Sequence, residues 1–103
     1  MQVIRAREFT AERPWGAKDI ACMQGISTRL HWTDQPYHWH VNDGDEVFVV
    51  LDGEVEMRYR DKGKEHKALL GCGDIFYAGV GTAHCAFPVG PARILVVEKQ
   101  GSI

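Results

Sequence analysis

The sequence predicts an all-β protein, a sandwich or barrel of short antiparallel strands, from three observations. Apolar and polar residues alternate with a period of two in several short runs, which is typical of half-buried strands. The chain contains 11 glycines, and many of them separate these runs as turn residues do. No stretch combines a helical period with a capping residue and a stop signal. Many short strands joined by glycine-rich turns favour a closed sandwich or barrel.

The expected strands follow one another at short intervals. The segment 54–60 alternates most regularly, with Val55, Met57 and Tyr59 on one face and charged residues on the other. The polar segment 61–64 after it predicts a hairpin turn. The first ten or so residues are compatible with an edge strand or with an arm for a partner subunit. The strands that we expect are two runs within 20–32 divided at Gly25, then 46–51, 54–60, 67–70, 74–78 and 93–98.

Length and composition indicate one domain, residues 1–103, without a nucleic-acid or membrane partner. A chain of 103 residues fits one compact unit, which buries about two thirds of the surface of its unfolded form. The formal net charge of -2 offers no electrostatic attraction to nucleic acid or to anionic lipid. The N-terminus lacks the apolar core of a signal peptide, and no apolar run reaches the ~20 residues of a membrane span. We therefore expect a cytoplasmic protein.

The cysteines predict no disulfide framework and no zinc knuckle. Cys22, Cys72 and Cys85 are odd in number, widely separated and not arranged as a C-x-x-C pair. Each is expected to be a small buried side chain. Cys85 follows His84 directly and should point to the opposite side of a strand, which argues against metal ligation and against a nucleophilic role.

Two elements of the sequence carry side chains that bind metals. In a strand, His38 and His40 would present two imidazoles to the same side. A polar loop then leads to Glu46, a carboxylate at the start of a strongly apolar strand, where a charge needs solvent or a partner. His84 follows a second strand and a glycine-rich turn. Three nitrogens and one oxygen suit iron, manganese, nickel, zinc or copper.

The spacing of these residues resembles the paired motifs of the cupin superfamily. In the first motif, two histidines separated by one residue are followed by a glutamate and, after six more residues, a glycine. His38, His40, Glu46 and Gly53 match this pattern. In the second motif, the glycines and the histidine fall at Gly73, Gly81 and His84. The resemblance covers residues 32–88, about half of the chain, and implies a cupin-like double-stranded β-helix or jelly-roll barrel.

The sequence departs from these motifs at three places. Trp32 stands where a glycine is expected, Gly79 stands where a proline is expected, and the loop from His40 to Glu46 is one residue longer than usual. The longer loop makes Asp45 a competing carboxylate. Glu46 is preferred, because its distance to Gly53 sets its register on the strand.

The resemblance implies one divalent transition-metal ion held by His38, His40, Glu46 and His84. It also implies a metal-dependent enzyme acting on a small oxygenated molecule, in the manner of a dioxygenase or an isomerase. Glu46 and Tyr59 are the candidate catalytic residues. Two alternatives remain open. One is a non-catalytic module that uses the same metal site to bind a sugar or a carboxylate, and the other is a barrel whose histidines serve packing alone.

Other side chains could shape the pocket or its surroundings. Trp15 is a candidate for the mouth or for an interface. Arg29, Arg58 and Arg60 could meet an anionic substrate, although a solvated strand face is the simpler reading. Because small barrels expose edge strands that a twofold partner can cover, we expect a homodimer, with the N-terminal segment as a candidate for exchange. The residues expected to line the barrel are Phe48, Val50, Val55, Met57, Tyr59, Phe76 and Phe87.

Overall fold

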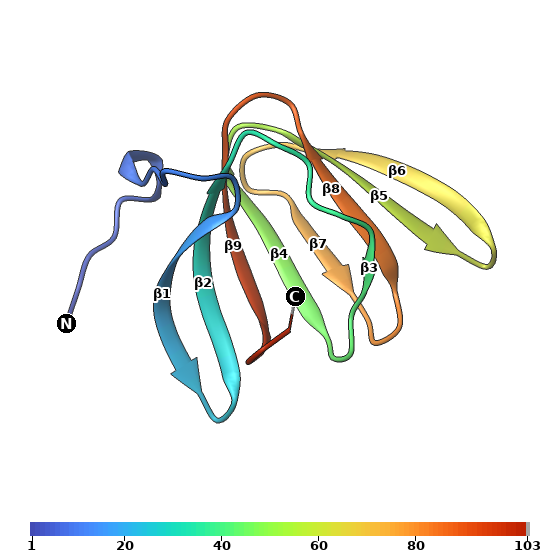
Figure 1. Ribbon diagram of the computed structural model, residues 1–103, viewed down its shortest axis with the longest axis horizontal. Coiled ribbons are helices and arrows are strands. Elements are labelled where there is room, and N and C mark those ends of the chain that lie inside the picture. Colours follow the sequence, from blue (N-terminus) through green and yellow to red (C-terminus); the bar gives the residue numbers. More distant parts are fainter. Residues whose placement is uncertain (103) are drawn as a thin grey trace.

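The fold consists of two antiparallel sheets packed face to face, which confirms the predicted all-β class (Figure 1). The computed structural model describes residues 1–102, and within them it contains strands and one short 3-10 helix but no α-helix. No helix in this part of the chain is long and apolar enough to cross a membrane. The strands are β1 (Gly16–Met23), β2 (Ile26–Thr33), β3 (His40–Val41), β4 (Glu46–Asp52), β5 (Val55–Asp61), β6 (Lys64–Leu70), β7 (Ile75–Ala78), β8 (Ala83–Pro88) and β9 (Ala92–Lys99).

Strands that are distant in sequence lie side by side in both sheets. One sheet has the order β1-β2-β9-β4-β7 and the other has the order β3-β8-β5-β6. The last strand, β9, therefore lies between β2 and β4 in the middle of the larger sheet. Figure 1 shows the β5–β6 hairpin extending beyond the rest of the molecule. This arrangement is the jelly roll that the motif spacing implies.

The hydrophobic core fills the space between the sheets, and it is built from alternate residues of β4, β5 and β9. Phe48 and Val50 of β4 face Val96 and Ile94 of β9 in register. Val55 and Met57 of β5 close the core from the other sheet and are fully buried. Tyr59 and Phe76 are partly buried against this cluster. The strand alternation thus located the core residues of β4 and β5 correctly.

Phe87 does not line the interior. Its register partner on β5 is Glu56, and the guanidinium carbon of Arg58 lies 3.9 Å from the centre of its ring. It therefore belongs to the outer face of the smaller sheet, where an arginine covers its ring. On β8, His84 and Ala86 take the inner face instead.

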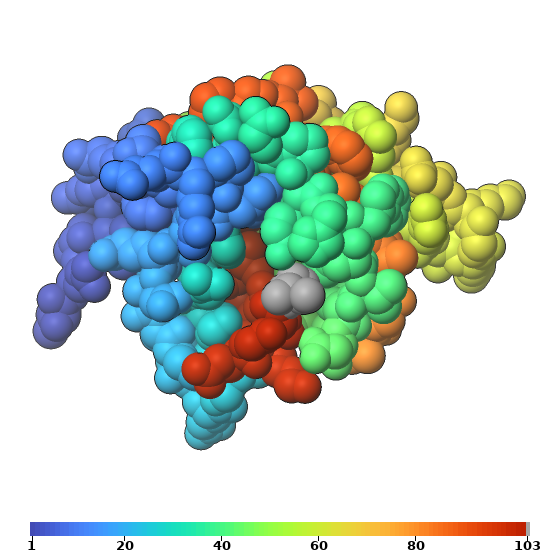
Figure 2. All heavy atoms as spheres, in the orientation of Figure 1, coloured from blue at the N-terminus to red at the C-terminus, as the bar shows by residue number. Residues whose placement is uncertain are grey.

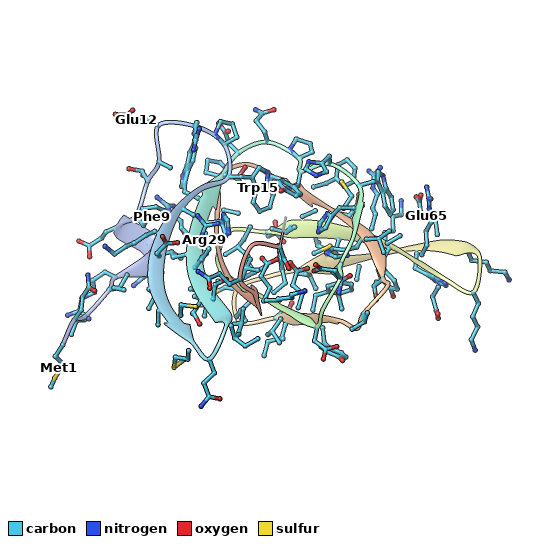
Figure 3. The ribbon with its side chains drawn as sticks, turned by 60° about the horizontal axis from the view of Figure 1, so that its bottom comes forward. Met1, Phe9, Glu12, Trp15, Arg29 and Glu65 are labelled. Atoms are coloured by element: carbon cyan, nitrogen blue, oxygen red, sulfur yellow. The ribbon has the colours of Figure 1, made fainter. Side chains whose placement is uncertain are left out.

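The N-terminal segment forms no edge strand. The chain enters β1 only at Gly16, and before it lies one short 3-10 helix, η1 (Ala6–Glu8). Residues of η1 contact β4, and Arg93 of β9 donates a hydrogen bond from Nε to the carbonyl of Phe9 at 2.9 Å. This segment therefore packs along the outside of the larger sheet, as Figure 3 also shows at Phe9.

The predicted hairpin turn at 61–64 has the conformation that its residues favour. Lys62 and Gly63 both have positive φ values, 52° and 76°, as a two-residue turn between twisted strands requires. Gly53 after β4 also has a positive φ, and a Cβ there would lie only 2.5 Å from the carbonyl oxygen of Pro91. The glycine of the first motif is therefore needed where the chain crosses closely over the segment that leads into β9.

Candidate metal centre

His40 comes from β3, the shortest strand, at the edge of the smaller sheet. Its register partner on β8 is His84, so the two imidazoles face the interior side by side with ring centroids 4.2 Å apart. The Nδ1 atom of His40 lies 3.2 Å from the carbonyl oxygen of His38. A carbonyl only accepts hydrogen bonds, so this contact places the proton on Nδ1 and leaves the Nε2 lone pair free in the neutral ring. Burial lowers the pKa of His40, which favours that neutral form.

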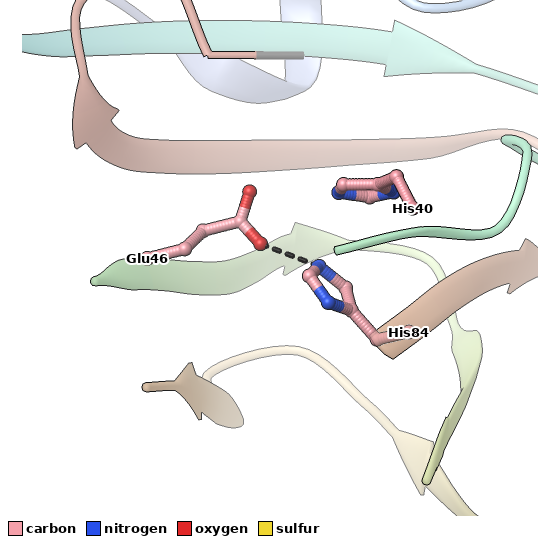
Figure 4. Close-up of side chains that lie close together, drawn as sticks. All are labelled: His40, Glu46 and His84. Atoms are coloured by element: carbon pink, nitrogen blue, oxygen red, sulfur yellow. Dashed lines mark hydrogen bonds and ion pairs between the residues drawn. The ribbon is translucent and has the colours of Figure 1, made fainter. Parts of the chain in front are cut away.

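Glu46 opens β4 in the opposite sheet and is buried, with 6% of its surface exposed. Its Cα partners are Ala78 on β7 and Glu98 on β9, so the carboxylate lies on the inner face of the larger sheet. A buried carboxylate is costly unless it has a partner. The partner in this structure is His84, whose Nε2 lies 2.6 Å from Oε1 of Glu46 (Figure 4).

His84 is the most deeply buried member, with 2% of its surface exposed. Its Nδ1 lies 3.1 Å from the carbonyl oxygen of Thr82, so Nδ1 carries a proton and donates it there. Burial by itself lowers the pKa of His84, but hydrogen bonds to Glu46 and Thr82 raise it above the ordinary value. The ring therefore holds a second proton readily, on the nitrogen that faces Glu46.

The three side chains form a donor set that fits a divalent cation. One ligand atom from each of His40, Glu46 and His84 lies within 4.8 Å of the other two. The Nε2 of neutral His84 and the carboxylate of Glu46 are both acceptors, so a positive charge is needed between them: a proton or a metal ion. Both Nδ1 atoms are fixed on backbone carbonyls, an arrangement common to metal-binding histidines. Two imidazoles and one carboxylate suit transition metals.

His38, the fourth predicted ligand, lies outside this cluster. The strand begins only at His40, so the alternation that would align His38 with His40 does not extend back to it. The His38 side chain is exposed, and its ring stacks on Tyr37 with centroids 4.1 Å apart. Its own carbonyl oxygen instead orients the His40 ring. The participation of His38 as a ligand therefore stays a prediction.

The structure distinguishes the two competing carboxylates. Asp45 is exposed, and its carboxylate accepts a hydrogen bond of 2.8 Å from the hydroxyl of Tyr77. It therefore points away from the histidines, whereas Glu46 points towards them (Figure 4). The register of Glu46 on β4, argued from its distance to Gly53, agrees with this orientation.

Asn42 connects the two loops that carry the ligands, and sequence reasoning did not single it out. Its side-chain amide donates to the carbonyls of Ala78, the last residue of β7, and of Gly79, the first residue of the second loop, at 3.1 and 2.8 Å. The backbone of Asn42 also bonds to Gly81 and Thr82. Thr82 in turn accepts the Nδ1 proton of His84. Asn42 thus links the His40–Glu46 loop to the segment that positions His84.

A cavity of about 170 Å³ opens beside the three ligands. For comparison, an apolar cavity of ~150 Å³ takes up a molecule of the size of benzene. Figure 2 shows the surface hollowed between β2 and the segment that contains β3, with β9 at the floor. The lining residues are Trp15, Arg29, His31, Tyr37, His40, Glu46, Phe48, His84, Ala86, Val96, Glu98 and Ser102.

One of these lining residues lies where the sequence suggested, and several others were not expected at the cavity. Trp15 does lie at the mouth, where its indole N–H donates to the carbonyl of Gln35 at 2.9 Å. Arg29, for which a solvated strand face was the simpler reading, lies on the inner face of β2 beside β9, and so does His31. Glu98 was not expected at all, and burial followed by the nearby Glu46 raises its pKa to about 7. The register of β9 between β2 and β4 brings it there, which no local pattern encodes.

Tyr59 and Cys85 have little access to this cavity. Tyr59 is the register partner of His84 on β5, but its ring packs against His66 and Phe76 and is not part of the cavity wall. Cys85 faces away from His84 and donates its thiol hydrogen to the carbonyl of Tyr37 at 3.0 Å. Burial raises the pKa of this thiol, which agrees with the expectation that it is no nucleophile.

The chain thus combines a two-sheet jelly roll with a candidate metal site, two histidines and a glutamate, at one end of its interior. The chain belongs to the cupin family: the Cupin_2 model, described as a cupin domain, matches residues 31–98. The motif resemblance is therefore confirmed. The matched segment includes all three clustered ligands and most of the cavity wall.

The relatives include oxygen-using enzymes. Over 62 residues the chain is 29% identical to 3-hydroxyanthranilate 3,4-dioxygenase of Bos taurus, which covers 60% of this chain and 22% of that enzyme. The likeness thus covers less than a quarter of the length of the dioxygenase.

Solved structures share the fold at low identity. A cupin-2 domain protein of Shewanella frigidimarina superposes with a TM-score of 0.77 at 24% identity, covering 87% of this chain and 85% of that one. Hydroquinone 1,2-dioxygenase in complex with Cd²⁺ and 4-hydroxybenzonitrile gives a TM-score of 0.76 at 19% identity, covering 93% and 69%. Oxalate oxidase gives 0.66 at 21% identity, covering 77% and 45%.

Proposed function

We propose that this cupin holds one divalent transition-metal ion between His40, Glu46 and His84. The proposal depends chiefly on one observation, the contact of 2.6 Å between Nε2 of His84 and the carboxylate of Glu46. With Nδ1 of His84 donating to Thr82, two acceptors face one another, and a metal ion can supply the positive charge between them in place of a proton. His40 adds a third donor on the same side. The ion could be iron, manganese, nickel, zinc or copper, because this donor set suits each of them.

We further propose that the protein acts on a small oxygenated molecule bound in the adjoining cavity, in a dioxygenase-like reaction. Three protein ligands leave positions open on an ion of higher coordination, and such an ion supplies Lewis-acid or redox chemistry that side chains lack. Phe48, Ala86 and Val96 provide an apolar wall for the body of the substrate. The names of two relatives, a hydroxyanthranilate dioxygenase and a hydroquinone dioxygenase, support this reaction class over an isomerase.

Metal loading followed by a turnover assay tests the proposal. The purified chain is freed of metal, loaded separately with each of the five ions, and analysed for metal content. We expect close to one ion per chain, and a content far below one with every ion would overturn the proposed site. Replacing His40 by alanine should abolish tight binding. The same change at His38 measures whether that exposed histidine is a ligand, since a ligand would show a loss like that of His40.

The reaction is tested by oxygen consumption. The loaded protein is mixed with catechols, hydroquinones, hydroxyanthranilate, diketones and thiols, and dissolved oxygen is followed. Turnover that disappears in the His84→Ala variant, while its circular dichroism is unchanged, would support the dioxygenase reading. Tight binding of a small molecule without any turnover would favour the alternative, a non-catalytic binding module with the same metal site.

A further inference from the structure

Arg29 is the feature of the cavity that the metal site does not explain. It lies on the inner face of β2, opposite Val96 of β9, and it lines the same cavity as the three ligands. It is the only lysine or arginine among the cavity-lining residues that the structure describes. Figure 3 shows Arg29 on β2 and Trp15 nearby, far from the hairpin tip marked by Glu65. A strand-face arginine that served only solubility would have no reason to face inwards.

The hydrogen bonds of Arg29 leave most of its donors free for a ligand. Its Nε donates to Asp19 at 2.7 Å, and this is its only side-chain hydrogen bond within residues 1–102. Asp19 is itself 83% exposed, so solvent weakens the pair. The contact uses one of the five N–H donors of the guanidinium and holds the group in place. The terminal nitrogens remain able to bind a carboxylate through two parallel hydrogen bonds.

The charges around the cavity favour an anion once the ion is bound. Glu46 and Glu98 contribute two carboxylates to the lining, and Arg29 contributes one cation. His31 donates from Nδ1 to the carbonyl of Trp15 at 3.1 Å, and burial lowers its pKa, so it adds no charge. Asp19, the partner of Arg29, is 83% exposed and does not line this cavity. Among the lining residues, a divalent ion and Arg29 together therefore exceed the two carboxylates by one positive charge, even with Glu98 fully ionised. An anionic ligand would balance that excess.

We propose that Arg29 is the anion-binding residue of this cavity, so that the ligand is a small carboxylate with an apolar body and a second oxygen for the ion. The inference rests on the proposed function, because the second oxygen needs the metal. The apolar body lies against Phe48, Ala86 and Val96, and the cavity of about 170 Å³ limits it to roughly one ring. Arg29 thereby selects acids over neutral analogues of the same shape.

A pair of matched probes tests this selectivity. 3-Hydroxybenzoate and 3-hydroxybenzamide have nearly the same shape, but only the first carries a charge. Isothermal titration of the zinc-loaded protein should show that the acid binds about tenfold or more tightly than the amide, as a charge-assisted contact predicts. In the Arg29→Gln variant that preference should disappear, while the zinc content stays at the wild-type level. The Arg29→Lys variant should retain part of the preference, because it keeps the charge without the planar fork.

Arg58 offers a matched control. Its Nε also donates to an acid, Glu56, at 2.8 Å, and its side chain is 37% exposed compared with 42% for Arg29. It lies on the outer face of β5 over Phe87, away from the cavity. The Arg58→Gln variant should bind both probes as the wild type does. An equal effect of the two substitutions would show a change of overall charge and would overturn the proposal.

The remaining outcomes also decide between the two proposals. If zinc binds but the wild type prefers the amide, binds neither probe, or keeps its preference in Arg29→Gln, the carboxylate assignment fails and the metal site stands. If zinc does not bind, the proposed function fails and this inference fails with it, because both the excess positive charge of the cavity and the partner of the second oxygen depend on the ion.

Discussion

At the scale of single residues, the properties of the site follow from two acceptors that face one another across the interior. Glu46 comes from one sheet and His84 from the other, and both are buried. Without a proton or an ion between them, their lone pairs would repel in a region from which water is largely excluded. In the metal-free protein a proton between the two atoms meets this demand, and the raised pKa of His84 favours its place on Nε2.

Replacing Glu46 by glutamine should weaken metal binding strongly, since the amide keeps the shape but removes the charge that balances the ion. We expect the dissociation constant for zinc to rise by about 100-fold, in keeping with the few kcal/mol of a buried charged contact. The Asp45→Asn variant is the matched control, because Asp45 bonds to Tyr77 on the outside. Titration calorimetry compares the two, and a larger loss in Asp45→Asn would reverse the assignment of the carboxylate.

Acidification should also release the metal, because each imidazole must be neutral to bind through Nε2. In the metal-free protein, hydrogen bonds to Glu46 and Thr82 outweigh the effect of burial and raise the pKa of His84 above 6.5. Protons therefore compete with the ion at His84 already above that pH. Burial lowers the pKa of His40, so protons compete there only at lower pH.

The measurement is the apparent zinc affinity between about pH 8 and about pH 5.5, the range in which histidine changes charge. The affinity should fall as the pH falls, first through His84 and then more steeply as His40 becomes protonated. An affinity that does not change over this range would contradict binding through the two histidines.

At the scale of elements, the ligands depend on two loops rather than on the strands alone. β3 is two residues long and therefore cannot by itself hold His40 rigidly. The loop that leads to β4 and the loop between β7 and β8 are joined through Asn42, which is buried with 6% of its surface exposed. The amide oxygen of Asn42 has no hydrogen-bond partner among the described residues, whereas its nitrogen has several. Its positioning role therefore belongs to the amide nitrogen.

Replacing Asn42 by alanine should both destabilise the fold and weaken metal binding. Loss of the amide leaves the buried carbonyls of Ala78 and Gly79 without this donor, which costs about 1–3 kcal/mol. Urea unfolding gives the stability and calorimetry gives the zinc affinity. If the role is positioning, added zinc should restore much of the lost stability, because the ion then holds the loops together.

The neighbouring Asp43→Ala variant controls for a general effect of the loop. Asp43 is exposed and pairs with Lys99 at 3.5 Å, an ion pair of small energetic value. Its replacement should change neither the stability nor the zinc affinity by a comparable amount. Wild-type zinc affinity in Asn42→Ala would remove Asn42 from the positioning of the site.

At the scale of the whole molecule, each of the two sheets in the described chain has one long edge strand. β1 ends the larger sheet opposite the shorter β7, and β6 ends the smaller sheet opposite the two-residue β3. Large apolar residues are exposed at both edges, among them Ile20 and Met23 on β1 and Leu69 on β6. An exposed edge strand with apolar side chains invites pairing with another chain.

We therefore predict a homodimer formed through one of these edges. Light scattering at micromolar concentration should give twice the mass of the chain. Lysine substitutions at Ile20 and Met23 test the β1 edge, and the same change at Leu69 tests β6. The edge whose variant becomes monomeric is the interface, while a monomeric wild type would contradict the prediction.

The sequence alone determined the parts of this protein that depend on local order. Period-two alternation located most strands and the core positions of β4 and β5, because the pleat of a strand couples sequence spacing to its faces. Glycine at positive φ located the turns. The spacing of His40, Glu46 and His84 indicated three residues that the structure brings together.

Only the tertiary structure decided what surrounds those residues. The alternation argument for His38 required a strand that already includes residue 38. β3 begins only at His40, because hydrogen bonding to β8 sets its start. Arg29 was expected on a solvated strand face, and no role was expected for Glu98, but the insertion of β9 between β2 and β4 places both at the cavity. Pairing between strands distant in sequence has no local signal, because it depends on how the whole chain buries its apolar faces. The candidate ligands could thus be predicted from the sequence, whereas the residues that line the adjoining cavity could be placed only with the fold.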